Sequence, residues 1–177
     1  NEDAMIQRRR YEDKLDEVLQ ALSKINATRK VGNASSEDTN LGPLVAKRQL
    51  DLLEDQVKDA LNKGARVFFG GKRPDDLNGA YYLPTVLTEI SFDMRVWTEE
   101  VFGAVLPIVT FNTDDEAIKL ANDTSYGLGA FVFTEDRIRY LKVAKQIQSG
   151  IVAHNNALYY HPACPFGGYK KSGNSRT

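Results

Sequence analysis

The sequence is poor in the residues that usually mark a disulfide scaffold, a metal site or a membrane anchor. It has one cysteine among 177 residues, which excludes an internal disulfide and gives no sign of an oxidising compartment. No apolar run is long enough to cross a bilayer, and no stretch has the pattern of a signal peptide. A formal net charge of −1 offers no basic surface to nucleic acid or to an anionic membrane. We therefore expect a cytoplasmic protein with neither of these partners.

Groups able to carry metal or nucleophilic chemistry are equally scarce. The two histidines, His154 and His161, lack the cysteine pair or H-E-x-x-H spacing of a metal site, so we expect no metal. His161 precedes Cys164 by three residues, and a Cys–His pair can form a nucleophile. The prolines at 162 and 165 leave no helix N-terminus that would activate this thiol. We therefore interpret Cys164 as a small packing residue and expect no catalytic residue in the chain.

Apolar periodicity predicts two helices and three strands in the first part of the chain. The helices are expected near 6–27 and 50–63, the second ending at Gly64, and the strands at 65–69, 81–90 and 105–111. Pro84 predicts that the second strand is irregular or at an edge of its sheet. Pro107 predicts that the first half of the third strand lies outside regular pairing.

The second part of the chain alternates strands and helices. Thr113 and Glu116 form a capping box before a short helix, and Thr134 is expected to cap another helix after a strand at 130–133. That helix should bury one edge, made of Ile138, Leu141, the stem of Lys145 and Ile147, before a last strand at 151–153. A βαβαβ pattern from 105 to 153 predicts an α/β fold, a mostly parallel sheet with helices on both faces. Without an evident linker, residues 1–177 are expected to form a single domain.

An acidic and aromatic stretch lies before the predicted strand at 105–111. Glu99, Glu100, Phe102 and Gly103 directly precede it, and such side chains at the mouth of a buried strand are common at ligand sites of α/β proteins. The alternative is a solvated turn that leads into a core strand. A second candidate is the glycine-rich segment 165–170, which resembles a phosphate loop only loosely. Its glycines equally allow a tight backbone beneath a pocket.

Three ordered motifs resemble those of the NAD(P)-dependent aldehyde dehydrogenase superfamily. Residues 99–103 with Pro107 resemble E-E-x-F-G-P, residues 121–128 match A-N-x-x-x-Y-G-L, and Asn155 with 165–173 matches N…P-F-G-G-x-K-x-S-G. The dipeptide at 42–43 and the tripeptide at 63–65 also fall where that family has G-P and K-G-A. This resemblance covers essentially the whole chain and implies the catalytic-domain fold of that superfamily, in incomplete form.

The resemblance implies roles for individual residues. Glu100 corresponds to the glutamate that hydrogen-bonds the nicotinamide ribose, and Phe102 to the phenylalanine that lies against the nicotinamide of NAD or NADP. Asn155 belongs to the active-site neighbourhood, and Tyr160 and Phe166 correspond to positions that line the aldehyde tunnel. The implied substrate is a small-molecule aldehyde, and family members are usually homo-oligomers.

The departures from the family pattern concern catalysis. The segments that carry the family's nucleophilic cysteine and general-base glutamate do not occur, and Ala104 replaces the motif's proline. The resemblance thus implies a partial catalytic domain without the cofactor-binding domain, and we expect the isolated chain to be inactive. A stand-alone non-catalytic pseudoenzyme or interaction domain is the alternative. A small flavodoxin-like binding protein fits the βαβαβ pattern but does not explain the three motifs.

Overall fold

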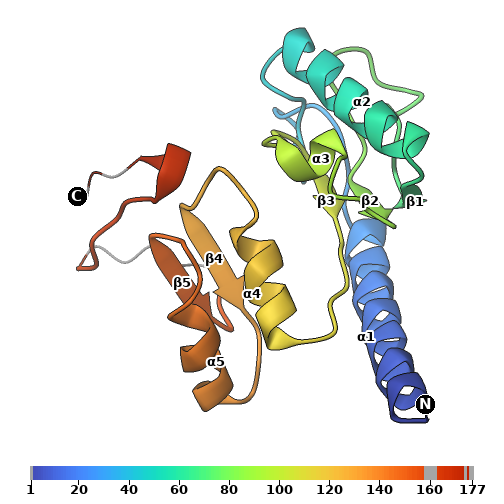
Figure 1. The fold of residues 1–177 in the computed structure, drawn as a ribbon. Coiled ribbons are helices and arrows are strands. Elements are labelled where there is room, and N and C mark those ends of the chain that lie inside the picture. Colours follow the sequence, from blue (N-terminus) through green and yellow to red (C-terminus); the bar gives the residue numbers. More distant parts are fainter. Residues whose placement is uncertain (1, 158–162, 174, 176–177) are drawn as a thin grey trace. The chain divides into compact units, whose positions relative to one another are not determined.

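The computed structural model describes residues 2–157, 163–173 and 175, with side chains from residue 14 onward. The chain divides into two compact units, of which the first ends at Thr110 and the second begins at Phe111. Figure 1 shows the elements of each unit along the chain. Each unit is described below by itself, and the single domain expected for residues 1–177 stays a prediction.

The first unit begins with two helices and two strands, and from β2 onward strands and helices alternate. The helices are α1 (Glu2–Ala27), α2 (Lys47–Asn62), α3 (Arg95–Thr98), α4 (Asp114–Asn122) and α5 (Arg137–Ala144), with a 3₁₀ turn η1 (Lys170–Ser172). The strands are β1 (Arg66–Phe69), β2 (Thr85–Thr88), β3 (Val105–Pro107), β4 (Gly129–Val132) and β5 (Ile151–His154). None of the helices in the described ranges has the length and apolarity needed to cross a membrane.

The first unit is organised around α2 and a three-stranded sheet. The strand order is β1-β2-β3, with β1 antiparallel and β3 parallel to β2. The buried stripe of α2 shares one core with the sheet and α3, made of Leu50, Leu53, Val57, Ala60, Ala65, Tyr82, Leu87, Met94, Val96 and Val105. The helix ends as predicted, because Gly64 adopts a φ of 102° that side-chain-bearing residues avoid.

Two strand predictions in this unit are wrong. The strand expected at 81–90 is β2, and its predicted edge position is wrong, because β2 lies in the centre of its sheet and Pro84 precedes its first residue. Its pairing with β1 is irregular, with a register shift between Val67 and Phe69. The strand expected at 105–111 is only β3, and its first half is the part that pairs. Pro107 ends this strand, and the side chain of Phe111 is exposed.

The second unit contains a parallel pair of strands joined through a helix. β4 pairs with β5 in parallel register from Gly129 with Ile151 to Val132 with His154, and α5 connects them. Figure 1 shows β4 and β5 side by side. The α/β class is confirmed, and two of the three strand pairings in the described ranges are parallel. The continuous βαβαβ sheet from 105 to 153 stays a prediction, because β3 pairs with β2 in the first unit and β4 pairs with β5 in the second, and each unit is described by itself.

The predicted buried edge and cap of α5 are wrong. Ile138 is 81% exposed, and Leu141 and Lys145 are also exposed, because Tyr140, Val143 and Ala144 take the half-buried face of the helix instead. Of the predicted edge, only Ile147, beyond the end of α5, is half-buried. The cap is Asp136, which accepts from the backbone N–H groups of residues 138 and 139 at 2.8 and 3.0 Å. A carboxylate in this position satisfies two amides that have no partner inside the helix.

The capping box of α4 is confirmed in its first half. The Thr113 hydroxyl accepts from the Glu116 N–H at 3.1 Å. The reciprocal bond differs by one residue, since the Glu116 carboxylate accepts from the N–H of Asn112 at 2.7 Å. The acidic side chain thus accepts a hydrogen bond from a backbone N–H just before the helix, as in a capping box.

Candidate functional site

The loop of residues 99–104, which carries the first motif, is bound to α2 through backbone and side-chain contacts. The buried side chain of Gln56 donates through Nε2 to the Glu99 carboxylate at 3.1 Å and to the Glu100 carbonyl oxygen at 3.2 Å. Gln49, two turns earlier, donates to the Phe102 carbonyl at 3.3 Å. A Cβ on Gly103 would lie 2.8 Å from a methyl carbon of Leu53. The loop therefore follows the surface of α2 closely.

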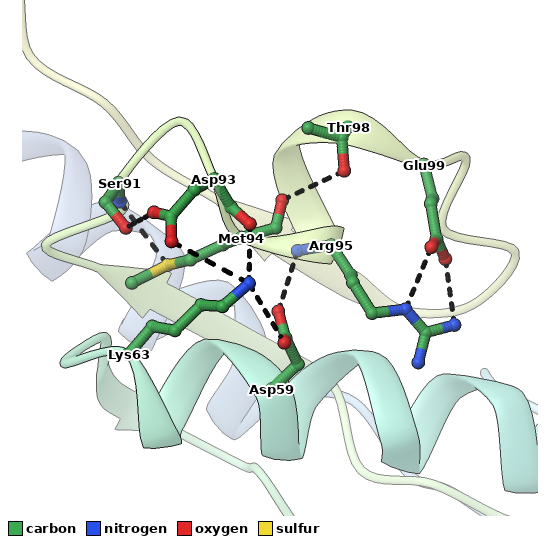
Figure 2. A network of polar contacts seen from close by, with 8 residues as sticks. All are labelled: Asp59, Lys63, Ser91, Asp93, Met94, Arg95, Thr98 and Glu99. Carbon is green, nitrogen blue, oxygen red and sulfur yellow. Dashed lines mark hydrogen bonds and ion pairs between the residues drawn. The ribbon is translucent and has the colours of Figure 1, made fainter.

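The first glutamate of the motif is fully engaged in this attachment. Glu99 accepts from Nε and Nη2 of Arg95 at 2.8 and 2.9 Å, a two-point contact drawn in Figure 2. Together with the bond from Gln56, its two oxygens take three donors. The Arg95 guanidinium lowers the pKa of Glu99, so this carboxylate stays ionised at neutral pH.

A second group of polar contacts fixes α3, the helix that leads into the loop. Figure 2 shows Asp59 accepting from the Arg95 N–H, at 2.8 Å, at the start of this helix. Lys63 donates to the Asp93 carbonyl at 2.6 Å and forms an ion pair with Asp59 at 3.1 Å. The hydrogen bond from the Arg95 backbone lowers the pKa of Asp59. One helix, α2, thus positions both α3 and the 99–104 loop.

The second glutamate and the phenylalanine of the motif remain available. Glu100 is exposed, and its carboxylate makes no hydrogen bond or ion pair with the described part of the chain. Phe102 is 61% exposed, although its backbone is bound by Gln49. The structure therefore brings both predicted cofactor-binding residues onto one bound loop and leaves their side chains free for a ligand.

The second and third motifs are interlocked in the second unit. The Gly127 N–H donates to the Ser172 hydroxyl at 3.0 Å, and its carbonyl accepts from the Tyr169 N–H at 2.9 Å. The Lys171 N–H donates to the Ser125 carbonyl at 2.9 Å. A Cβ on Gly150 would lie 1.8 Å from the carbonyl oxygen of Gly167, so only glycine fits at 150. The glycine-rich segment thus serves close backbone packing, one of its two predicted alternatives.

Side chains of the same two motifs close the end of α4. Lys170 donates through Nζ to the carbonyl oxygens of Asn122 and Thr124 at 2.7 and 2.9 Å. The Asn122 amide donates to the Gln146 carbonyl at 2.9 Å and accepts from the Gln148 N–H at 2.7 Å. The ammonium group lies where the carbonyls of a helix C-terminus lack partners.

The predicted substrate-pocket residues follow β5 and the glycine-rich segment. Asn155, at a φ of 50°, pairs its amide with both backbone groups of Thr134 at 2.8 and 2.9 Å. His154, directly before it, stacks on Tyr140 with ring centroids 4.3 Å apart. Phe166 is half-buried, and Tyr160 lies outside the described residues. The pocket roles of Asn155, Tyr160 and Phe166 stay predictions.

Within the described residues, neither the thiol nor the potential metal ligands form a site. Cys164 is a free, exposed thiol. Among the residues that the structure describes, no group of three or more His, Cys, Asp or Glu side chains is placed to hold a metal ion.

Three residues that hold the first motif, Gln49, Gln56 and Arg95, were not predicted from the sequence. A signal for Gln56 was present, because it falls on the apolar stripe of α2 between Leu53 and Ala60. A polar residue on such a stripe needs a hydrogen-bond partner. The identity of that partner is a tertiary contact, which no local pattern shows.

Comparison with known proteins agrees with the three motifs. Residues 2–177 match the Aldehyde dehydrogenase family. The mitochondrial succinate-semialdehyde dehydrogenase of Oryza sativa subsp. japonica is 39% identical over 161 residues, which are 91% of this chain and 30% of that protein. The chain thus spans about a third of the length of the curated relatives that it matches.

Solved structures show the same fold. A betaine aldehyde dehydrogenase from Staphylococcus aureus in complex with NAD+ has a TM-score of 0.85 and 40% identity, covering 91% of this chain and 33% of that one. An NADP dependent enzyme of E. coli has a TM-score of 0.87 and 32% identity, covering 92% of this chain and 34% of that one.

Because Glu99 is hydrogen-bonded within the described part of the chain and the Glu100 carboxylate is not, substitutions of the two residues should differ in their effect on stability. Glu99→Ala should lower the free energy of unfolding by about 1 kcal/mol, because it removes three hydrogen bonds at a partly exposed site. Glu100→Ala should change it by less than about 0.5 kcal/mol. Urea unfolding followed by the fluorescence of the single tryptophan, Trp97 in α3, measures both. Equal losses would contradict the assignment.

Adjacent lysines provide a matched test in the second unit. Lys170→Met should lower the free energy of unfolding by about 1 kcal/mol, because two carbonyls lose a charged donor. Lys171→Met should be neutral, since the exposed Lys171 side chain has no bond within the described part of the chain. Amide hydrogen exchange at residues 125–128 and 169–172 reports the effect locally. Faster exchange in both variants would contradict a specific role for Lys170.

Proposed function

Because this chain belongs to the aldehyde dehydrogenase family, we propose that it serves the NAD(P)+-dependent oxidation of an aldehyde to a carboxylic acid. Its part is to supply the surface that receives the nicotinamide end of the cofactor and a part of the aldehyde-binding pocket. The proposal covers NAD+ and NADP+ alike, because the similar structures include one in complex with NAD+ and one described as NADP dependent.

One observation supports the proposal above the others, namely the asymmetry of the 99–104 loop. Glu99 has its carboxylate occupied by Arg95 and Gln56, whereas Glu100 and Phe102 project from a bound backbone with free side chains. A motif that served only to link α3 to β3 would not need an exposed carboxylate and an exposed ring two residues apart on one loop. This arrangement suits a ligand with hydroxyl groups next to a flat ring.

The two free side chains fit the chemistry of a nicotinamide nucleoside. The Glu100 carboxylate can accept hydrogen bonds from the hydroxyl groups of a ribose, and the Phe102 ring can lie against a planar ring. When bound, the cofactor supplies a hydride acceptor for the aldehyde carbon. The residues of this chain orient that acceptor, because the backbone of the loop is fixed on α2 while its side chains remain exposed.

The second unit is assigned to the aldehyde side of the reaction. We place Asn155, Tyr160 and Phe166 in the substrate pocket, since aromatic walls suit an apolar or aromatic aldehyde. Cys164 is not the nucleophile in this proposal, because it lies directly before the P-F-G-G motif and outside the segment that carries the family's nucleophilic cysteine. We further propose that the protein assembles as a homo-oligomer and is located in the cytoplasm.

The chain by itself should not catalyse the reaction. Purified residues 1–177, mixed with NAD+ or NADP+ and a panel of aldehydes, should give no reduced nucleotide above background. Absorbance at the reduced-nicotinamide band measures this. Aldehyde-dependent reduction that copurifies with the 177-residue chain, and not with a contaminant, would show that a nucleophile is present in it.

The role of Glu100 is tested in the product of the complete reading frame that encodes these residues. Glu100→Gln should raise the KM for the nicotinamide cofactor about tenfold or more, because a charge-assisted hydrogen bond is weakened. The KM for the aldehyde should change little. Steady-state kinetics with either substrate varied separates these two effects.

The adjacent glutamate is the control for this substitution. Glu99→Gln should act mainly on thermal stability, since its carboxylate contacts protein groups. An unchanged cofactor KM in Glu100→Gln would overturn the proposed cofactor contact. Absence of aldehyde-dependent reduction in the wild-type protein would instead favour a non-catalytic member of the family.

A further inference from the structure

Gln56 is a buried amide in an otherwise apolar stripe. It is 1% exposed, and the other buried residues of α2 are Leu50, Leu53, Val57 and Ala60. Such a position normally holds an aliphatic side chain, because burial of an amide costs free energy unless both ends of the group are hydrogen-bonded. The presence of a glutamine here therefore needs a reason other than packing.

The amide is only half satisfied. Nε2 donates to the Glu99 carboxylate and to the Glu100 carbonyl, whereas Oε1 is buried without a hydrogen-bond partner. The orientation of the amide is determined by its surroundings, since both neighbours of Nε2 are oxygens and can only accept. An orphaned buried oxygen makes glutamine a poor choice for stability alone.

The hydrogen bonds of Gln56 reach two consecutive residues of the loop. One bond fixes Glu99, which Arg95 also holds, and the other fixes the peptide group of Glu100 directly. A peptide carbonyl that is held in place restricts the direction in which the Glu100 side chain leaves the backbone. We infer that Gln56 is a positioning residue, which keeps the 99–104 loop in the shape that presents Glu100 and Phe102 to the cofactor.

This inference rests on the proposed function and gives a signature that packing alone would not produce. Gln56→Met keeps a similar volume, removes the orphaned oxygen and leaves Glu99 paired with Arg95. The protein should then be as stable as the wild type or more so, because buried polar groups can often be replaced by apolar ones without loss. Affinity for the cofactor should nevertheless fall, because a loop without these hydrogen bonds samples more conformations and a smaller fraction of the molecules is in the binding-competent one.

The experiment measures stability, loop order and cofactor affinity in the product of the complete reading frame. Gln56→Met should leave the thermal midpoint within about 2 °C of the wild type or above it. Amide hydrogen exchange at residues 99–103 should accelerate, and calorimetry with NAD+ and with NADP+ should show the Kd of the preferred nucleotide raised about fivefold or more. Asn62→Met, an exposed amide on the same helix, is the matched control and should change none of the three.

The outcomes separate this inference from the proposed function. If Glu100→Gln weakens cofactor binding while Gln56→Met changes neither Kd nor loop exchange, the positioning role is overturned and the proposed function stands. If the wild type binds neither nucleotide, or Glu100→Gln binds as tightly as the wild type, the proposed function fails and the inference with it. If Gln56→Met and Gln56→Leu both lower the thermal midpoint strongly, Gln56 is a core residue and the inference is overturned.

Discussion

The attachment of the 99–104 loop to α2 is the interaction on which the candidate site depends. The apolar stripe of α2 fixes the helix on its sheet, and the polar residues of the same helix then fix what lies beside it. Asp59 and Lys63 hold α3, whereas Gln56 holds the loop that follows. Because one rigid helix carries both contacts, the exposed side chains of the loop start from a fixed backbone.

A binding site is preorganised when its backbone is fixed and its ligand-binding side chains make no contacts within the protein. In the first motif, Glu99 and Gly103 attach the loop, and Glu100 and Phe102 are left for a ligand. The second and third motifs are mainly structural in this sense, since the contact of Gly150 with the 167 carbonyl and the bonds of the lysine at 170 serve packing. Ligand contacts and structural contacts therefore alternate within a few residues of sequence.

Local patterns predicted the elements, and tertiary contacts decided what the patterns left open. The stop of α2 at Gly64 and the capping of α4 by Thr113 are local effects, and both were predicted correctly. The face of α5 was not, because a short helix with apolar residues all round offers more than one stripe, and Tyr140 takes the inner position. The family resemblance predicts cofactor contacts for Glu100 and Phe102, but only the partners of Glu99 explain why two adjacent glutamates differ in their contacts.

The most direct test is a crystal structure of the complete protein with NAD+ or NADP+ bound. We expect a carboxylate oxygen of Glu100 within hydrogen-bond distance of a hydroxyl of the nicotinamide ribose. We also expect that Glu99 keeps its contacts with Arg95 and Gln56 in the same crystal. A cofactor held by Glu99, or one bound away from the 99–104 loop, would show that Glu100 is not the ribose contact.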